Sequence, residues 1–101
     1  MNTYCYILKL NPRLWDDASW TEHDHQIVHQ HYLRLKTDFE SGKLLHVGRT
    51  DDPTHDGFGI VVFRAENIED AKHYMKEDPA IIGRQMTGMC FEYRLIFHQQ
   101  S

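Results

Sequence analysis

The sequence lacks the marks of several large classes of protein. It holds two cysteines in 101 residues, and none of its apolar runs approaches the ~18 residues of a membrane-spanning helix. Two cysteines are too few for the disulfide framework of a small secreted domain, and the first residues lack the basic start and small-residue cleavage site of a signal peptide. We therefore expect a cytoplasmic protein without membrane attachment.

Positive charge is also scarce. Eleven Lys and Arg against fifteen Asp and Glu leave a net charge of −4, with no basic stripe to attract nucleic acid. The sequence contains neither a Gly-rich dinucleotide turn nor a phosphate-binding loop. It therefore predicts no nucleic-acid partner and no cofactor.

Histidine is abundant instead, with eight residues, and this side chain titrates near neutral pH and binds metals. His25 and His29 are four residues apart in a predicted helix, a spacing that can hold a metal ion. No second pair is evident, and zinc sites need about three or four protein ligands. A solvated helix face explains these histidines better, so we predict no metal site.

No repeat or linker divides the chain, and we expect one domain over residues 1–101. Apolar runs and alternation predict four strands, at residues 4–10, 43–47, 58–63 and 89–97. Two helices are predicted between them, one from the Thr21 cap to Ser41 and Gly42, the other from the Asn67 cap to before Pro79. Residues 81–88 are expected to be irregular.

The resulting order, β-α-β-β-α-β, predicts an α+β fold of the ferredoxin-like type, a four-stranded antiparallel sheet with two helices on one face. The alternative, a doubly wound parallel sheet, is excluded because the link at residues 48–56 is too short for a usual parallel crossover. The strands at residues 4–10 and 58–63 are apolar on both faces, yet two helices cover only one. We therefore expect a homodimer in which two sheets pack face to face.

In the first predicted helix, Val28, Tyr32, Leu35 and Phe39 recur at intervals of four, three and four residues, which predicts one buried stripe. His31 lies about 60° from the centre of the line through Val28, Leu35 and Phe39, at ~100° per residue. It is therefore expected at the margin of the buried face, where a side chain can reach a cleft.

Several segments, in order along nearly the whole chain, resemble the YciI-like (YCII-related) family. They are His31-Tyr32-Leu33-Arg34-Leu35, Gly42-Lys43-Leu44-Leu45, Gly48-Arg49-Thr50, Gly57-Phe58-Gly59-Ile60 and Asp78-Pro79-Ala80-Ile81. The resemblance implies a ferredoxin-like chain that pairs into a dimeric α+β barrel, with a site built on His31 and Asp78. One activity in the family resembles elimination of chloride from a chlorinated hydroquinone. Many relatives carry an arginine where this chain has Val28, three residues before the histidine.

A His–Asp pair has a clear chemical use, because the carboxylate fixes the imidazole tautomer and stabilises its cation while the imidazole moves a proton. The residues alone also allow His31 to be a hydrogen-bonded boundary histidine and Asp78 to cap the turn at Pro79. Further candidates are aromatic residues that could cover an apolar ligand or pack on the surface, and arginines that could hold an anion: Trp15, Trp20, Arg49, Arg84 and Arg94.

Two remaining features have structural interpretations. The loop at residues 51–57 fails the spacing of a calcium loop, and its Asp, Pro and Gly residues suit tight turns that would form a rim of the site. Cys5 and Cys90 are expected as buried, reduced thiols on neighbouring strands. Three functions remain open: an acid–base enzyme of the elimination or isomerisation type, a non-catalytic ligand-binding or regulatory homodimer, and a purely structural oligomer without a pocket beside His31.

Overall fold

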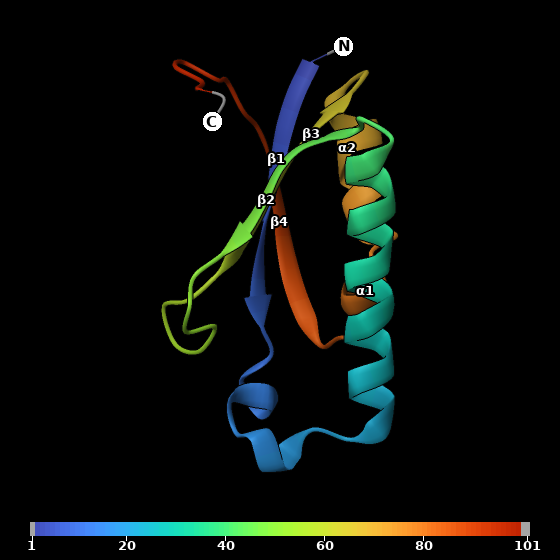
Figure 1. The fold of residues 1–101 in the computed structure, drawn as a ribbon, viewed down its shortest axis with the longest axis vertical. Helices are drawn as coiled ribbons and strands as arrows, with labels where there is room; N and C mark the ends of the chain where they lie inside the picture. The colour runs from blue at the N-terminus through green and yellow to red at the C-terminus, as the bar shows by residue number, and fades with distance from the viewer. Residues whose placement is uncertain (1, 100–101) are drawn as a thin grey trace.

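A four-stranded antiparallel sheet lies at the centre of residues 2–99, the part of the chain that the computed structural model describes (Figure 1). Its strands are β1 (Asn2–Leu10), β2 (Leu44–Arg49), β3 (Gly59–Ala65) and β4 (Met86–Glu92), in the order β2-β3-β1-β4. Helices α1 (Glu22–Glu40), α2 (Ile68–Lys76) and α3 (Pro79–Ile82) complete the α+β fold. This arrangement is consistent with the ferredoxin-like prediction.

The helix ends follow the local signals in the sequence. Thr21 caps α1 by accepting a hydrogen bond from the Asp24 N–H, while the Asp24 carboxylate accepts one from the Thr21 N–H, which completes a capping box. At the other end, Gly42 takes a φ of +88°, a conformation that glycine adopts without steric cost. Asn67 caps α2 as predicted, and this helix ends before Pro79.

The predicted buried stripe of α1 is wrong in part. Leu35 is buried, but Tyr32 and Phe39 are 58% and 54% exposed. The buried line of the helix runs instead through Asp24, His31 and Leu35. Hydropathy misses this line because it treats polar residues as exposed, whereas a polar side chain is readily buried when the fold supplies its hydrogen bonds.

The chain between the second helix and the last strand also differs from expectation. Residues 81–88 are not irregular throughout, because Asp78 caps the short helix α3 with Pro79 at its first turn, and β4 already begins at Met86. The strand ends at Glu92, so the predicted strand does not reach residue 97. The extent of β4 follows its pairing with β1. Met86 lies opposite Leu10 at the end of β1, and Glu92 lies opposite Tyr4 near the start of β1.

The loop before α1 contains two short 3₁₀ helices, η1 (Pro12–Trp15) and η2 (Asp17–Ser19). No helix within residues 2–99 is long and apolar enough to span a membrane. β1 and β4 are neighbours, as expected for the strands that carry Cys5 and Cys90, and both cysteines are free thiols. Burial raises the pKa of each thiol, which favours the protonated form.

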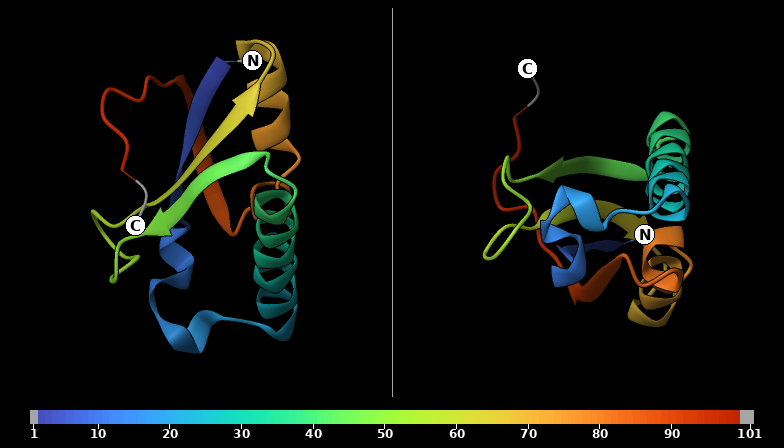
Figure 2. Two further views of the ribbon diagram at one scale, coloured as in Figure 1. Left: turned by 45° about the horizontal axis from the view of Figure 1, so that its top comes forward. Right: turned by 90° about the horizontal axis from the view of Figure 1, so that it is seen from below.

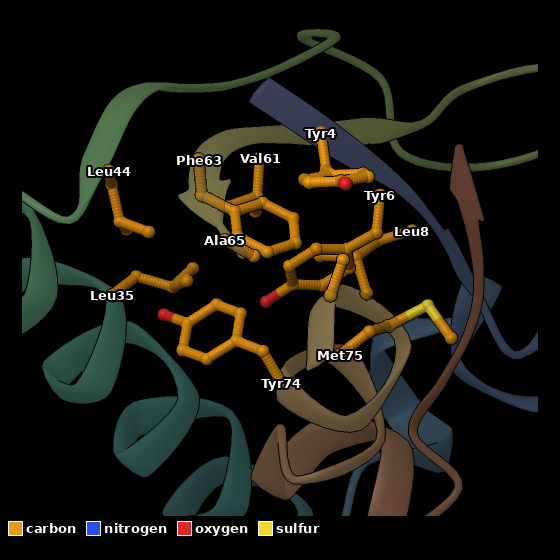
Figure 3. Close-up of a cluster of buried hydrophobic side chains, with 11 residues drawn as sticks. Tyr4, Tyr6, Leu8, Leu35, Leu44, Val61, Phe63, Ala65, Tyr74 and Met75 are labelled. Atoms are coloured by element: carbon orange, nitrogen blue, oxygen red, sulfur yellow. The ribbon is translucent and has the colours of Figure 1, made fainter. Parts of the chain in front are cut away.

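The hydrophobic core lies between the sheet and the helices, which cover the same face (Figure 2). β1 and β3 contribute aromatic rings to it, and α2 contributes another. Tyr6 and Phe63 make an edge contact with centroids 5.8 Å apart, and Tyr74 lies 5.0 Å from Phe63 (Figure 3). Leu35 and Met75 fill the space beside these rings. The core therefore ties both long helices to the central strands.

The opposite face of the sheet is also apolar, as the sequence predicted. Cys5 and Val62 pair across β1 and β3 and are buried, while Met89 and Phe91 of β4 are 64% and 44% exposed. The segment after β4 lies on this side, away from the helices (Figure 2). It carries further exposed apolar side chains, with Phe97 at 94% exposure.

Candidate functional site

His31 and Asp78 lie in direct contact although 47 residues separate them in the chain. Nδ1 of His31 is 2.7 Å from Oδ1 and 2.8 Å from Oδ2 of Asp78. Asp78 is completely buried, and the His31 side chain is 11% exposed. An ionised carboxylate only accepts hydrogen bonds, so the Nδ1 atom carries the proton. The structure thus brings together the two residues that the family resemblance implies.

The position of each residue follows from its secondary structure. His31 projects from the buried line of α1, and Asp78 is the cap of α3, where its Oδ1 accepts a hydrogen bond from the Ala80 N–H at 2.9 Å. The capping role that the sequence suggested for Asp78 is therefore present together with its contact to His31. One carboxylate starts a helix and orients an imidazole.

Tyr6 is a third member of the site, which sequence reasoning missed. Its hydroxyl donates a hydrogen bond to Asp78 Oδ2 at 2.8 Å. Burial and the adjacent Asp78 carboxylate raise the pKa of Tyr6 far above its usual value, so this residue remains a neutral donor. The alternation of β1 places Tyr6 on the inner face, but nothing in the sequence indicates that its hydroxyl meets Asp78.

The charge of Asp78 is stabilised despite its burial. Burial by itself would raise the pKa of this carboxyl. The hydrogen bond and charge of His31, together with donation from Tyr6 and the Ala80 N–H, outweigh that effect and hold the pKa of Asp78 below its usual value. A carboxylate that stays ionised near neutral pH is the partner that an acid–base histidine requires.

A cleft of about 580 Å³ opens beside His31, between α1 and the inner face of the sheet. Its walls are mostly apolar and include Val28, Leu35 and Phe58, while Arg49 and Asp51 contribute charge. The volume lies in the range of small-molecule sites, which are usually apolar with a few polar groups. The imidazole of His31 is one of the few polar groups in this wall.

Two of the predicted ligand contacts line this cleft. Trp20 is half-buried there, where its Nε1 donates to the Leu14 carbonyl at 2.9 Å. Arg49 lies at the end of β2 and donates through Nη1 to the carbonyls of Thr50 and Asp51. The loop predicted to form a rim does so, because Asp51 and Pro53 also line the cleft.

The other predicted contacts lie outside the lining of the cleft. The Trp15 ring packs against the His55 ring in a tilted arrangement with centroids 4.3 Å apart. Arg84 is exposed in the turn before β4, with a φ of +67°, and Arg94 follows β4. The lining of the cleft in the described chain therefore does not include Trp15, Arg84 or Arg94, and their roles in ligand binding stay predictions. Arg84 lies in the turn after α3 and Arg94 beyond the end of β4, and residue type alone could not reveal these positions.

The abundance of histidine does not translate into a cluster of metal ligands. Across residues 2–99, no group of three His, Cys, Asp or Glu side chains is placed to hold a metal ion. His25 stacks on Trp20, and His29 stacks on Tyr32 along the same helix. These two histidines therefore make aromatic contacts on the surface of α1.

No protein-family model matches the chain, and no curated protein matches it significantly. The resemblance to the YciI-like family therefore stays a prediction that rests on the sequence segments quoted above.

Proposed function

We propose that this chain is a YciI-like protein that binds a small molecule in the cleft and acts on it by acid–base chemistry, without a cofactor. The observation that carries the proposal is a buried, hydrogen-bonded His–Asp pair whose histidine lines an apolar cleft. A carboxylate buried this deeply is costly unless its partners compensate it, so such pairs are enriched at functional sites.

In the proposed mechanism, His31 moves the proton and Asp78 orients it. Asp78 binds the protonated Nδ1, which leaves Nε2 as the basic atom for the substrate. Nε2 takes a proton from the substrate, and Asp78 stabilises the resulting imidazolium. Return of that proton to another substrate atom gives isomerisation, whereas departure of a leaving group with its electron pair gives elimination.

The lining of the cleft favours an aromatic or enolic acid as the substrate. Phe58, Leu35 and Val28 offer apolar surface for a ring, and Arg49 offers a cation for a carboxylate or phenolate. Val28 stands where many relatives carry an arginine, so the anion contact is assigned to Arg49 on the other side of the cleft.

The proposal includes a homodimer formed through the outer face of the sheet. Met89 and Phe91 are large apolar side chains left exposed on a strand, beside the buried Cys5 and Val62. A sheet face of this kind is normally covered, and a second copy offers the same apolar face for isologous packing. The exposed apolar segment after β4 extends the same surface.

A ligand-binding or regulatory homodimer without catalysis is the second candidate, favoured by the same apolar cleft. The third hypothesis, a purely structural oligomer, predicts no pocket beside His31, and the cleft counts against it. The Asp78→Asn variant distinguishes an enzyme from a protein that only binds the ligand. In an enzyme this substitution removes turnover, because the orienting carboxylate is lost while the walls of the cleft remain.

A thermal-shift screen of small aromatic carboxylates and phenols tests the binding site. We expect a ligand that raises the melting temperature of the wild-type protein but not of His31→Ala. His29→Ala is the matched control, because His29 is exposed on the same helix and lies outside the cleft. A stabilising ligand that acts equally on both variants would place the binding site elsewhere.

A further inference from the structure

Arg34 is a mostly buried cation next to the His–Asp pair. It lies three residues after His31 on α1, so both side chains project from the same side of the helix. Its side chain is only 19% exposed, and Nη1 lies 3.9 Å from Asp78 Oδ2. That nitrogen is buried and has no hydrogen-bond partner among the residues described.

The rest of the guanidinium is held by Tyr74. Arg34 Nη2 donates to the Tyr74 carbonyl at 2.7 Å, and the guanidinium carbon stands 4.0 Å from the centre of the Tyr74 ring. These contacts define the position of the cation without using either oxygen of Asp78. Those oxygens remain available to His31 and Tyr6, as the shorter hydrogen bonds show.

The other titratable groups in this region come from β1, α1, α2 and the turn before β2. Tyr6 of β1 and His31 of α1 meet Asp78 directly. Asp38 of α1 and Lys43, just before β2, meet Tyr74 instead: the Tyr74 hydroxyl donates to Asp38 at 2.6 Å, and Lys43 Nζ lies 4.7 Å from the ring centre. Arg34 is therefore the permanent cation nearest to the Asp78 carboxylate among these groups.

We propose that Arg34 is a positioning residue of the site, which adds a permanent positive charge beside Asp78 so that the carboxylate keeps a countercharge whenever His31 gives up its proton. A buried carboxylate needs positive charge nearby, and without Arg34 only protonation of His31 would supply it. Arginine stays charged at all accessible pH values, whereas histidine does not. This inference rests on the proposed function, in which neutral His31 is the form that accepts a proton.

A purely structural role for Arg34 makes a different prediction. If the residue only ties α1 to α2 through Tyr74, then a neutral side chain that keeps a donor should leave the titration of His31 unchanged. Arg34→Gln removes the charge and retains an N–H donor, and Arg34→Lys retains the charge. Lys36→Gln removes one positive charge from an exposed position two residues along the same helix, so it controls for net charge.

The test is an NMR titration of the His31 ring nitrogens in the full chain. In Arg34→Gln we expect the midpoint to move to higher pH by about one unit relative to wild type, the size expected for losing one nearby partly screened charge. Arg34→Lys should return the midpoint close to the wild-type value, and Lys36→Gln should leave it unchanged. Equal midpoints in Arg34→Gln and Lys36→Gln would overturn the proposal.

A second variant keeps the proposal testable if Arg34→Gln does not fold. Arg34→Met keeps an unbranched, largely apolar stem while removing the guanidinium and its charge, and it should raise the midpoint in the same direction.

The titration is independent of ligand and turnover. A failed ligand screen with a raised midpoint in Arg34→Gln would reject the proposed function and retain the charge role of Arg34. A ligand that binds wild type but not His31→Ala, together with an unchanged His31 midpoint in Arg34→Gln, would support the proposed function and reject the charge role of Arg34.

Discussion

Tyr6 donates its hydroxyl proton to Asp78 across 72 residues of sequence, with 2.8 Å between Oη and Oδ2. The contact joins the middle of β1 to the cap of α3, and it places a neutral donor on the carboxylate that orients His31. Three elements of the fold, β1, α1 and α3, thus meet at one carboxyl group. Stability and the proposed chemistry depend on the same contacts.

Replacing Tyr6 with Phe should destabilise the fold by about 1–3 kcal/mol, because a buried carboxylate loses a donor that no water can easily replace. Urea unfolding at neutral pH measures this free energy. Tyr4→Phe is the matched control, since Tyr4 is buried on the same strand and its hydroxyl makes no hydrogen bond to the residues described. Equal losses in the two variants would show that the Tyr6 hydroxyl contributes nothing specific.

The low pKa of Asp78 predicts a stability that depends on pH. A carboxyl whose pKa is lower in the folded than in the unfolded protein contributes stability above its unfolded value, and that contribution is lost as the pH falls through the folded value. The difference in unfolding free energy between wild type and Asp78→Asn should therefore be largest near neutral pH. It should shrink below about pH 4, the ordinary aspartate range.

Unfolding by urea over a series of pH values provides the check. Asp51→Asn is a suitable control because Asp51 is exposed on the loop at the rim of the cleft. A difference between wild type and Asp78→Asn that stays constant down to low pH would contradict the assignment of Asp78 as a stabilised carboxylate.

Arg49→Gln should weaken the binding of aromatic carboxylates by about tenfold to a hundredfold, the usual loss when one charge-assisted hydrogen bond is removed. Uncharged ligands of the same shape should lose much less. Isothermal titration with matched acid and amide ligands separates the two effects. Arg84→Gln serves as the control, because Arg84 is exposed and lies outside the lining of the cleft.

Phe91→Glu should convert the proposed dimer into a monomer, because it buries an unpaired charge in each half of an isologous interface. Light scattering at micromolar concentration should give twice the 12.0 kDa of one chain for wild type and a single-chain mass for the variant. Ile82→Glu is the control, since Ile82 is 67% exposed but belongs to α3 in the helical layer. A wild-type mass of one chain would exclude the dimer.

Much of the fold was predictable because its signals are local. The capping box at Thr21 and Asp24, the positive φ at Gly42 and the cap at Asn67 each act over a few residues of backbone. Strand extents were less predictable, since β4 begins and ends where β1 offers a partner. The short helix α3 was not predicted, because the segment expected to be irregular, residues 81–88, includes the end of this helix.

The sequence by itself determined the order of strands and helices, the apolar outer face of the sheet and, through resemblance, His31 and Asp78 as candidates. The tertiary structure decided which polar groups meet. It placed Tyr6 and Arg34 beside Asp78 and left Arg84 outside the cleft. The physical reason is range: caps and alternation act between near neighbours in the chain, whereas burial of a charged group depends on partners that only the packed sheet and helices bring within reach.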